Sequence, residues 1–372
     1  MRTLGIDLGT TNTVAAIDGT TIAHAVGVDS SPILPSVVAF LPNGAVLAGG
    51  AAKRRRAIDP KNTIYSAKRL MGQRWLSYAT TQFRKSYPFD LIETAEGGCA
   101  FQTRGGKQSP VDIGSRLIDK LYAARPALRS DTSAVVAVPT AFESSAREAT
   151  RAAVQQAGIE HVSIVDEPIA TAIAYGTARN ERNQLSVVFD LGGGTFDLAV
   201  LEGAGERARV VGHAGDPYLG GDDIDQVLSQ WVAAEVLQRH GWDLRADPEV
   251  FDRLVVQCER AKVRLGLAPS TQIELAQVDP AAPLAPHNVT LDRHKLSELA
   301  QPLVGRTLLL CDQVLREAQL RPDRIEAVFL AGGTTLMPLV RDAVAHYFGR
   351  LPHCELDPME VVAMGASLSG GA

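Results

Sequence analysis

Short apolar runs alternate along the chain with longer stretches in which apolar positions recur at helical spacing. The runs at 134–138 and 327–331 are continuous, and helical stretches follow them at 143–156 and 338–347. A short apolar run followed by an amphipathic stretch is typical of the strand and helix of an α/β unit. The pattern therefore predicts an α/β protein with strands and helices over these ranges.

This order of elements occurs twice. The two strand-like runs lie 193 residues apart, and the two alanine-rich helices expected after Asp166 and Asp357 lie 191 residues apart. Solenoid repeats have periods of about 20–50 residues, so this period is far too long for a solenoid. We therefore expect two homologous α/β lobes.

Each lobe is expected to carry an inserted subdomain. Weak periodicity and many glycines over 43–108 indicate an insertion in the first lobe, and a jump in polarity over 179–184 indicates the boundary between the lobes. The predicted division is lobe I at 1–180, with core 1–37 and 109–180 and insertion 38–108, and lobe II at 181–372, with core 181–217 and 300–372 and insertion 218–299.

The composition argues against several classes of function. The chain has 372 residues, of which 45% are hydrophobic and 21% charged, as in ordinary globular domains. The net charge of −5 argues against a nucleic-acid partner. We interpret the basic run at 53–56 as a solvated helix face rather than an anion site. None of the four cysteines stands in a C-x-x-C pair, which argues against a zinc or redox motif.

Signals for export or membrane insertion are absent from the pattern. The N-terminus lacks a basic segment followed by an apolar region, and no apolar run approaches the roughly 20 residues that span a bilayer. We expect no membrane partner and a cytoplasmic location.

Two glycine-rich turns carry the candidate chemistry. They are Asp7-Leu8-Gly9-Thr10-Thr11 and Asp190-Leu191-Gly192-Gly193-Gly194-Thr195, and each lies between two strand-like runs. Glycine lets backbone N–H groups approach an anion, threonine adds a hydroxyl, and a carboxylate can hold a hydrated divalent cation. One such turn could be a plain hairpin. Two in the same setting predict a nucleotide clamped between the lobes.

Other residues allow two interpretations each. Glu167 begins a helix, where it either complements the helix dipole or orients a metal-bound water. Lys68 is either a surface lysine or a positive charge placed on a terminal phosphate. The pairs Gly220-Gly221 and Gly332-Gly333 are either tight loops or places where backbone approaches a nucleotide. The sequence has no G-x-x-x-x-G-K-[ST], no dinucleotide G-x-G-x-x-G and no G-x-S-x-G.

The chain resembles the ATPase domain of the 70-kDa heat-shock chaperones of the DnaK type, within the actin-like superfamily, over nearly all of residues 1–370. The resemblance implies two duplicated lobes that flank a nucleotide cleft. Eight ordered stretches carry it: 5–12, 67–72, 138–142, 166–176, 189–197, 215–223, 259–262 and 331–334.

The resemblance also implies roles for single residues. Asp7, Glu167 and Asp190 would hold Mg²⁺ through water, and with Lys68 and Thr195 they would form the catalytic set. Lys68 would position the attacking water. ATP or ADP would be bound by Gly9, Thr10, Thr11, Asn12, Gly192, Gly193, Gly194, Gly220, Gly221, Glu259, Lys262, Gly266, Gly332 and Gly333, with Glu259 and Lys262 on the ribose. K⁺ is a further possible ion. Pro139 and Arg147 match positions that relay nucleotide state.

Some positions depart from the family pattern. Gly266 replaces a serine, Leu336 an arginine and Met359 an aspartate, so base selectivity is open; these changes resemble the bacterial HscC branch. Ser163 replaces an arginine, which weakens the expectation of a J-domain partner. A nucleotide exchange factor is a further expected partner. The peptide-binding half does not follow Ala372, so protein clients are expected only if such a domain exists.

We expect slow hydrolysis of ATP to ADP and phosphate, with lobe closure coupled to the nucleotide. An actin-like filament-forming ATPase and, less favoured, a small-molecule kinase of the same superfamily remain as alternatives. Pelleting with nucleotide would distinguish the first, and phosphate transfer to a metabolite the second.

Overall fold

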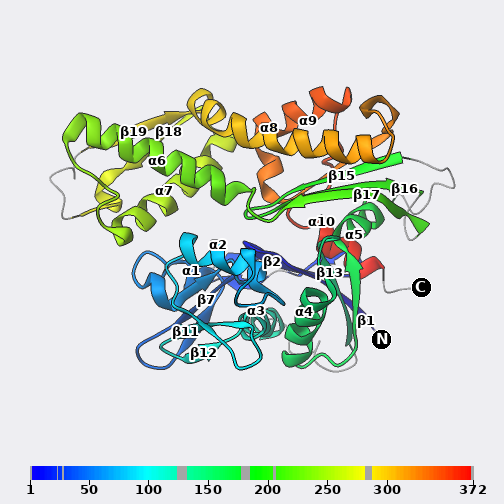
Figure 1. The fold of residues 1–372 in the computed structure, drawn as a ribbon, viewed down its shortest axis with the longest axis horizontal. Coiled ribbons are helices and arrows are strands. Elements are labelled where there is room, and N and C mark those ends of the chain that lie inside the picture. The colour runs from blue at the N-terminus through cyan, green and yellow to red at the C-terminus, as the bar shows by residue number, and fades with distance from the viewer. Residues whose placement is uncertain are drawn as a thin grey trace.

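The computed structural model describes residues 2–22, 24–26, 29–123, 132–176, 185–203, 207–280 and 287–369. The chain forms two lobes, one above the other in Figure 1. The polar segment at 179–184, where the sequence predicts the boundary between the lobes, lies outside the described residues, as do Gly370 to Ala372.

The sheet of the lower lobe has the strand order β14-β13-β1-β2-β3, and β6 also pairs with β2. Strand β1 pairs in antiparallel with β2, and in parallel with β13, where Ile6 lies opposite Val136. Helices α3 and α4 pack together beside it. The bounds are β1 Arg2–Leu8, β2 Asn12–Ile17, β3 Thr20–Thr21, β6 Ile33–Pro35, β13 Thr132–Val138, β14 Val162–Asp166, α3 Pro110–Ala123 and α4 Ser144–Gln156.

The sheet of the upper lobe, ordered β17-β16-β15-β20, repeats this plan. Its strand β15 pairs in antiparallel with β16 and in parallel with β20, as β1 does with β2 and β13. The strands and helices predicted around 134–138 and 327–331 are confirmed to within a few residues. The bounds are β15 Leu185–Leu191, β16 Phe196–Glu202, β17 Arg209–Asp216, β20 Ala327–Ala331 and α9 Pro338–Phe348.

The remaining elements extend the two lobes. Those of the lower lobe are β4 His24–Val26, β5 Asp29–Ser31, β7 Val37–Phe40, β8 Val46–Ala48, α1 Gly50–Lys53, η1 Pro60–Asn62, β9 Thr63–Tyr65, η2 Ala67–Leu70, α2 Tyr78–Ser86, β10 Leu91–Glu93, β11 Cys99–Thr103 and β12 Gly106–Gln108. Those of the upper lobe are α6 Gly221–His240, α7 Pro248–Leu267, β18 Ser270–Glu274, η6 Leu275–Gln277, β19 Asn288–Asp292, α8 Arg293–Glu317, η7 Pro322–Arg324 and η8 Gly333–Leu336.

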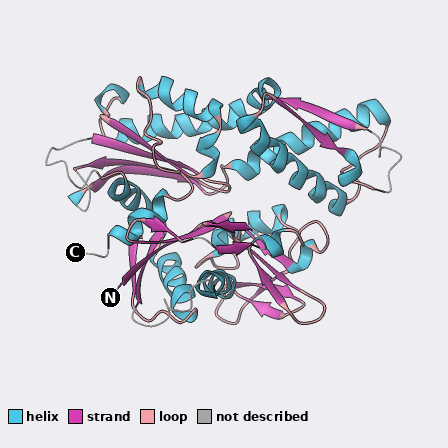
Figure 2. Cartoon of the chain, turned by 180° about the vertical axis from the view of Figure 1, so that it is seen from behind, coloured by secondary structure: helices cyan, strands magenta, loops and turns pink. Residues whose placement is uncertain are grey.

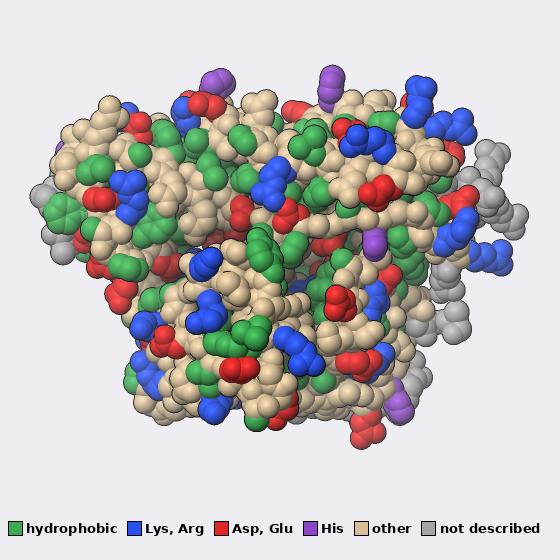
Figure 3. All heavy atoms as spheres, in the orientation of Figure 1, with side chains coloured by type: hydrophobic (Ala, Val, Ile, Leu, Met, Phe, Trp, Pro, Cys, Tyr) green, Lys and Arg blue, Asp and Glu red, His purple; other side chains and the backbone are tan. Residues whose placement is uncertain are grey.

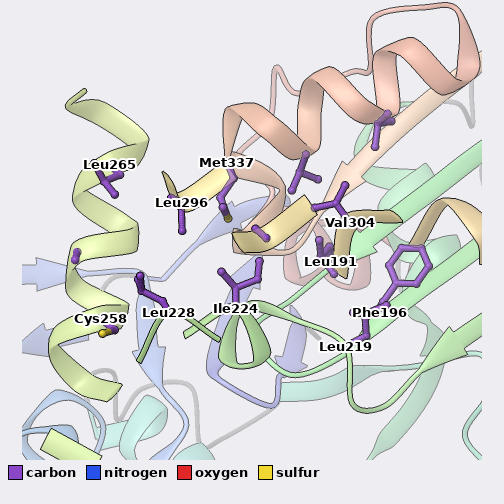
Figure 4. Close-up of a cluster of buried hydrophobic side chains, with 14 of the residues drawn as sticks. Leu191, Phe196, Leu219, Ile224, Leu228, Cys258, Leu265, Leu296, Val304 and Met337 are labelled. Atoms are coloured by element: carbon purple, nitrogen blue, oxygen red, sulfur yellow. The ribbon is translucent and has the colours of Figure 1, made fainter. Parts of the chain in front are cut away.

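Each lobe has its own hydrophobic core. The core of the upper lobe joins the sheet to the long helices α6, α7 and α8, and Leu191, Phe196 and Leu228 lie within it (Figure 4). Figure 2 shows helices above this sheet and a further group of helices beside it, which the labels of Figure 1 identify as α8 and α9 above and α6 and α7 beside. In the described part of the chain, no helix is both long and apolar enough to cross a membrane.

Two helices join the lobes. Helices α5 (Glu167–Ala174) and α10 (Val361–Leu368) pack against each other between the two sheets (Figure 1). They approach so closely that a Cβ atom on Gly365 would lie 1.7 Å from the carbonyl oxygen of Ala170. A Cβ atom on Gly5 of β1 would likewise lie 2.2 Å from the backbone nitrogen of Ser367. Glycine is therefore needed at both contacts.

We expect Gly365→Ala to lower the free energy of unfolding by about 1–3 kcal/mol, because the added methyl group forces the two helices apart. Gly305→Ala, within α8, is the matched control. Nothing lies within 4 Å of its Cβ position, so this change should stabilise the protein by about 0.5–1 kcal/mol. Thermal denaturation of both variants measures the difference, and shifts of the same sign would contradict the assignment.

Candidate functional site

The two glycine-rich turns meet at one cavity between the lobes, called here the central cavity. Its volume is about 580 Å³, counting the space at its open mouth. The lower turn follows β1 and the upper turn follows β15, so both reach the cavity from the ends of corresponding strands. Its lining consists of Asp7, Gly9, Thr10, Thr11, Asn12, Lys68, Glu167, Asp190, Gly192, Gly193, Gly194, Thr195, Gly332, Gly333, Pro358, Met359 and Val362.

The turns contact each other directly. A Cβ atom on Gly193 would lie 2.1 Å from Oγ1 of Thr11, and one on Gly194 would lie 2.7 Å from Cγ2 of Thr10. Gly332 has a φ of +80°, and a Cβ atom there would lie 2.4 Å from the backbone of Leu191. A side chain at Gly193 or Gly194 would separate the two turns, and one at Gly332 would displace the upper turn, so the glycines allow two lobes to share one site.

Lys68 and Glu167 form an ion pair inside the cavity. Nζ of Lys68 donates to Oε1 of Glu167 over 2.8 Å, and the two side chains are 9% and 8% exposed. Lys68 is therefore not a surface lysine. Glu167 begins α5, as expected of a residue that complements the helix dipole, but it also holds this ammonium in place.

The carboxylates around Lys68 have perturbed acidities. Burial raises the pKa of Asp7 to about 7, although Lys68 opposes the rise and Glu167 adds to it. The pKa of Asp190 lies well above its usual range because of burial and then the charges of Glu167, Asp197 and Asp7. Burial would lower the pKa of Lys68, but the attraction of Glu167 and Asp7 outweighs it and raises the value.

Asp197 is a fourth carboxylate of this group, to which the sequence analysis gave no role. Burial and the charge of Glu167 raise its pKa to about 7. Asp197 lies directly opposite Asp190 in the antiparallel pair β15–β16. Opposed residues point to the same face of a sheet, and two strands joined by a tight turn pair in antiparallel, so the Asp on the far side of the upper turn is the signal that could have identified it.

This arrangement fits a hydrated cation together with an anion. Four carboxylates face one ammonium, which leaves an excess of negative charge in a buried place. Among the described residues, no three acidic, His or Cys side chains converge closely enough to chelate a metal directly. Water molecules would have to link a divalent cation to the carboxylates. Oγ1 of Thr11 is buried without a hydrogen-bond partner in the described structure, so a donor is available for a phosphate oxygen.

The residues predicted for the ribose lie on α7, beside the cavity rather than in its lining. Nζ of Lys262 donates to Asp225 over 2.7 Å and to the carbonyl of Gly221 over 2.8 Å. Glu259 accepts from Nζ of Lys53 over 2.6 Å. A Cβ atom on Gly220 would lie 2.5 Å from the carbonyl oxygen of Gly193, so the loop before α6 supports the upper turn.

Of the four positions that depart from the family pattern, only Met359 lines the central cavity. Its side chain lies against Gly333. Gly266 does not line it, and its Cβ position faces open space on α7. Leu336 also lies outside the lining and is 41% exposed. Ser163 is exposed on β14.

Two residues of the basic run at 53–56, Lys53 and Arg56, form ion pairs between the lobes. Nη2 of Arg56 donates to Asp252 of α7 over 2.8 Å, and its guanidinium lies 4.0 Å from the ring centre of Tyr65. Both charged side chains are only 15% exposed. With the Lys53–Glu259 pair, this contact ties residues 53–56 of the lower lobe to α7 of the upper lobe. The interpretation of a solvated face is wrong for Arg56 and fits Arg54, which is exposed.

Charged side chains are spread over the surface of both lobes in Figure 3, and the two lobes meet along a horizontal seam.

Arg147, predicted to relay nucleotide state, lies in the lower lobe on α4. Its Nη2 donates to Asp166 over 2.7 Å, and its Nε donates to the carbonyl of Phe142 over 2.9 Å. These bonds link α4 to the residue that precedes Glu167.

The acidities of the buried carboxylates predict a pH dependence of stability. Asp7 and Asp197 have pKa values near 7, against about 3.9 in an unfolded chain. Between these values the native state binds more protons than the unfolded state, so stability falls as the pH rises through this window. We expect the melting temperature of the metal-free protein to fall between about pH 4 and 7.

Asp197→Asn should show a smaller fall, since one of the titrating groups is removed. Scanning calorimetry at a series of pH values, with and without Mg²⁺, measures it. A slope equal to that of the wild type would contradict the assignment.

Comparison with known proteins gives a consistent result. The family model described as "Hsp70 protein" matches residues 3–372. The chain is similar to the chaperone protein DnaK of Thermus thermophilus, with 37% identity over 376 residues, which cover 100% of this chain and 60% of that relative. The chain thus spans about three fifths of the length of this relative.

Proposed function

Because the chain belongs to the Hsp70 family, whose members are ATPases, we propose that its central cavity binds ATP with Mg²⁺ between the lobes and hydrolyses it slowly. The observation that carries this proposal is the meeting of two glycine-rich turns at one cavity, where Asp7, Glu167 and Asp190 line the wall together with Lys68. The family match does not favour a filament-forming ATPase or a small-molecule kinase.

The two turns would bind the phosphates. Backbone N–H groups of Gly9 and Gly192 to Gly194 come close to an anion because no side chain covers them. Thr10, Thr11 and Thr195 add hydroxyl donors, and Asn12 adds an amide. Oγ1 of Thr11, buried and without a partner in the described structure, supports this role.

Asp7, Glu167 and Asp190 would hold the magnesium ion through water. The ion would supply positive charge to the phosphate oxygens and relieve the repulsion among the carboxylates. The raised pKa values of Asp7 and Asp190 support this role, because they report a site that is short of positive charge. A K⁺ ion could compensate further charge at the same place.

Lys68 would stabilise the charge that develops on the terminal phosphate and would orient the attacking water. Its ion pair with Glu167 fixes the ammonium, which lowers the cost of reorganisation during the reaction. Little covalent chemistry is required of the protein, since phosphoryl transfer is catalysed mainly by positioning and electrostatics.

The nucleoside would lie toward Gly332, Gly333 and Met359, with Glu259 and Lys262 near the ribose. In the structure Glu259 is paired with Lys53, and Lys262 with Asp225. Ribose binding would therefore compete with, or add to, the contacts that close the cleft. Met359 gives the base side of the cavity an apolar wall. The resemblance of this base pocket to that of the HscC branch, and its selectivity for a base, stay predictions.

The activity of a whole chaperone goes beyond this chain, which covers 60% of the relative. We propose that nucleotide-dependent closure of the lobes would control a peptide-binding domain if one is joined to it. A nucleotide exchange factor is the expected partner, and Ser163 argues against a standard J-domain partner. The predicted domain boundaries and the cytoplasmic location belong to the same proposal.

Calorimetry with ATP, ADP and GTP, each with and without Mg²⁺, tests the binding proposal. We expect ATP and ADP to bind more tightly with Mg²⁺, because the cation neutralises the carboxylates. Equal affinities for ATP and GTP would show that the apolar base pocket does not select adenine. If no nucleotide bound under any of these conditions, the proposed function would be wrong.

We expect Lys68→Ala to lower single-turnover hydrolysis by about 10²–10³-fold, the scale for loss of one preorganised charge-stabilising group. Binding of ADP should change much less, because ADP lacks the terminal phosphate that Lys68 contacts. Rapid-quench measurements of hydrolysis and calorimetry of ADP binding separate the two effects. Arg54→Ala is the control, because it also removes one positive charge, from an exposed side chain outside the site.

A further inference from the structure

A second cavity, called here the side cavity, adjoins the central cavity. It has a volume of about 790 Å³, counting the space at its open mouth. Thr10, Lys68 and Thr195 line both cavities, so the two spaces meet at these three side chains. Nothing in the proposed binding of ATP uses the rest of the side cavity.

Both lobes form the walls of the side cavity. Met71 and Phe142 contribute from the lower lobe, and Pro217 and Tyr218 from the upper lobe. The hydroxyl of Tyr218 donates to the carbonyl of Ala79 over 2.7 Å, so a hydrogen bond closes the wall between the lobes. The largely apolar walls offer a departing anion few groups that would hold it.

The charges along the side cavity are compatible with an anion. The ammonium of Lys68 lies at the inner end, and the guanidinium of Arg69 lies 4.6 Å from the ring centre of Tyr218 in the wall. Nε of Arg69 is buried and has no hydrogen-bond partner in the described structure. The carboxylate of Asp216 is paired with Arg306. The carboxylate of Asp197 also lines the side cavity, together with the cations Lys68 and Arg69.

We propose that the side cavity is the route by which inorganic phosphate leaves, and can rebind to, the ADP-bound protein. This inference rests on the proposed function, which places the terminal phosphate at Thr10, Lys68 and Thr195. The rest of the nucleotide then lies toward Gly333 and Met359 in the central cavity. ADP therefore stands between the freed phosphate and the mouth of the central cavity, whereas the side cavity opens from the phosphate in the other direction.

The test narrows the mouth of the side cavity without touching the residues assigned to catalysis. Ala141 lines the cavity and is exposed in the turn that follows β13, so Ala141→Trp places an indole at the mouth. Gln73→Trp narrows it from a different segment. Ser144→Trp is the matched control, because Ser144 is exposed, lies three residues further on, and does not line the cavity.

The readout is the binding of inorganic phosphate to the preformed ADP complex with Mg²⁺, which needs no turnover. Stopped-flow mixing measures the association of phosphate with the ADP complex, and a fluorescent phosphate sensor measures its dissociation. A fluorescent ADP analogue measures the release of ADP. We expect both tryptophan plugs to slow phosphate association and dissociation by about tenfold or more, while ADP release changes by less than about twofold. Ser144→Trp should match the wild type.

Unchanged phosphate rates in both plugged variants would overturn the route. So would a wild type whose ADP complex takes up no phosphate, or one that releases phosphate only at the rate of ADP release. Each of these results leaves the binding of ATP and ADP intact, and so separates failure of the route from failure of the proposed function. A chain that binds no ADP would overturn both.

Discussion

The excess of negative charge between the two lobes is the constraint on which the site depends. Asp7, Glu167, Asp190 and Asp197 come from four different segments and surround the ammonium of Lys68 in a buried place. Such a cluster is stable only with protons or cations bound, because burial and mutual repulsion both disfavour the charged carboxylates. A cation bound together with a phosphate ligand would supply the missing positive charge. The repulsion among the carboxylates would then fall, which would stabilise contact between the two lobes.

Close packing of backbone makes this convergence possible. Glycines at 193 and 194 let the two turns touch, Gly365 lets α10 pass close to α5, and Gly5 lets α10 lie against β1. Glu167 is the first residue of α5, so a helix that joins the lobes also carries a residue of the site. A shift of one lobe against the other at this helix pair would therefore be felt directly at Lys68.

Polar contacts, rather than a shared hydrophobic core, close the outer part of the cleft. The pairs Lys53–Glu259 and Arg56–Asp252, and the hydrogen bond from Tyr218 to Ala79, all cross from one lobe to the other. The two large hydrophobic cores lie within separate lobes. Water can replace polar contacts at modest cost, whereas separating apolar surfaces is expensive, so this interface suits a cleft that opens and closes.

The sequence alone determined the local elements and the chemistry of the turns. Apolar runs at 134–138 and 327–331 fixed strands because their burial is set by their own composition, and the repeated Asp-Gly-Thr pattern located both turns that line the central cavity. Tertiary structure decided what the charged side chains do. Nothing local distinguishes Arg56 from Arg54, yet one is paired across the cleft and the other is exposed. Lys68 and Glu167, 99 residues apart, acquire their partnership only when the chain folds, because charge–charge energies depend on distance and burial that no stretch of sequence contains.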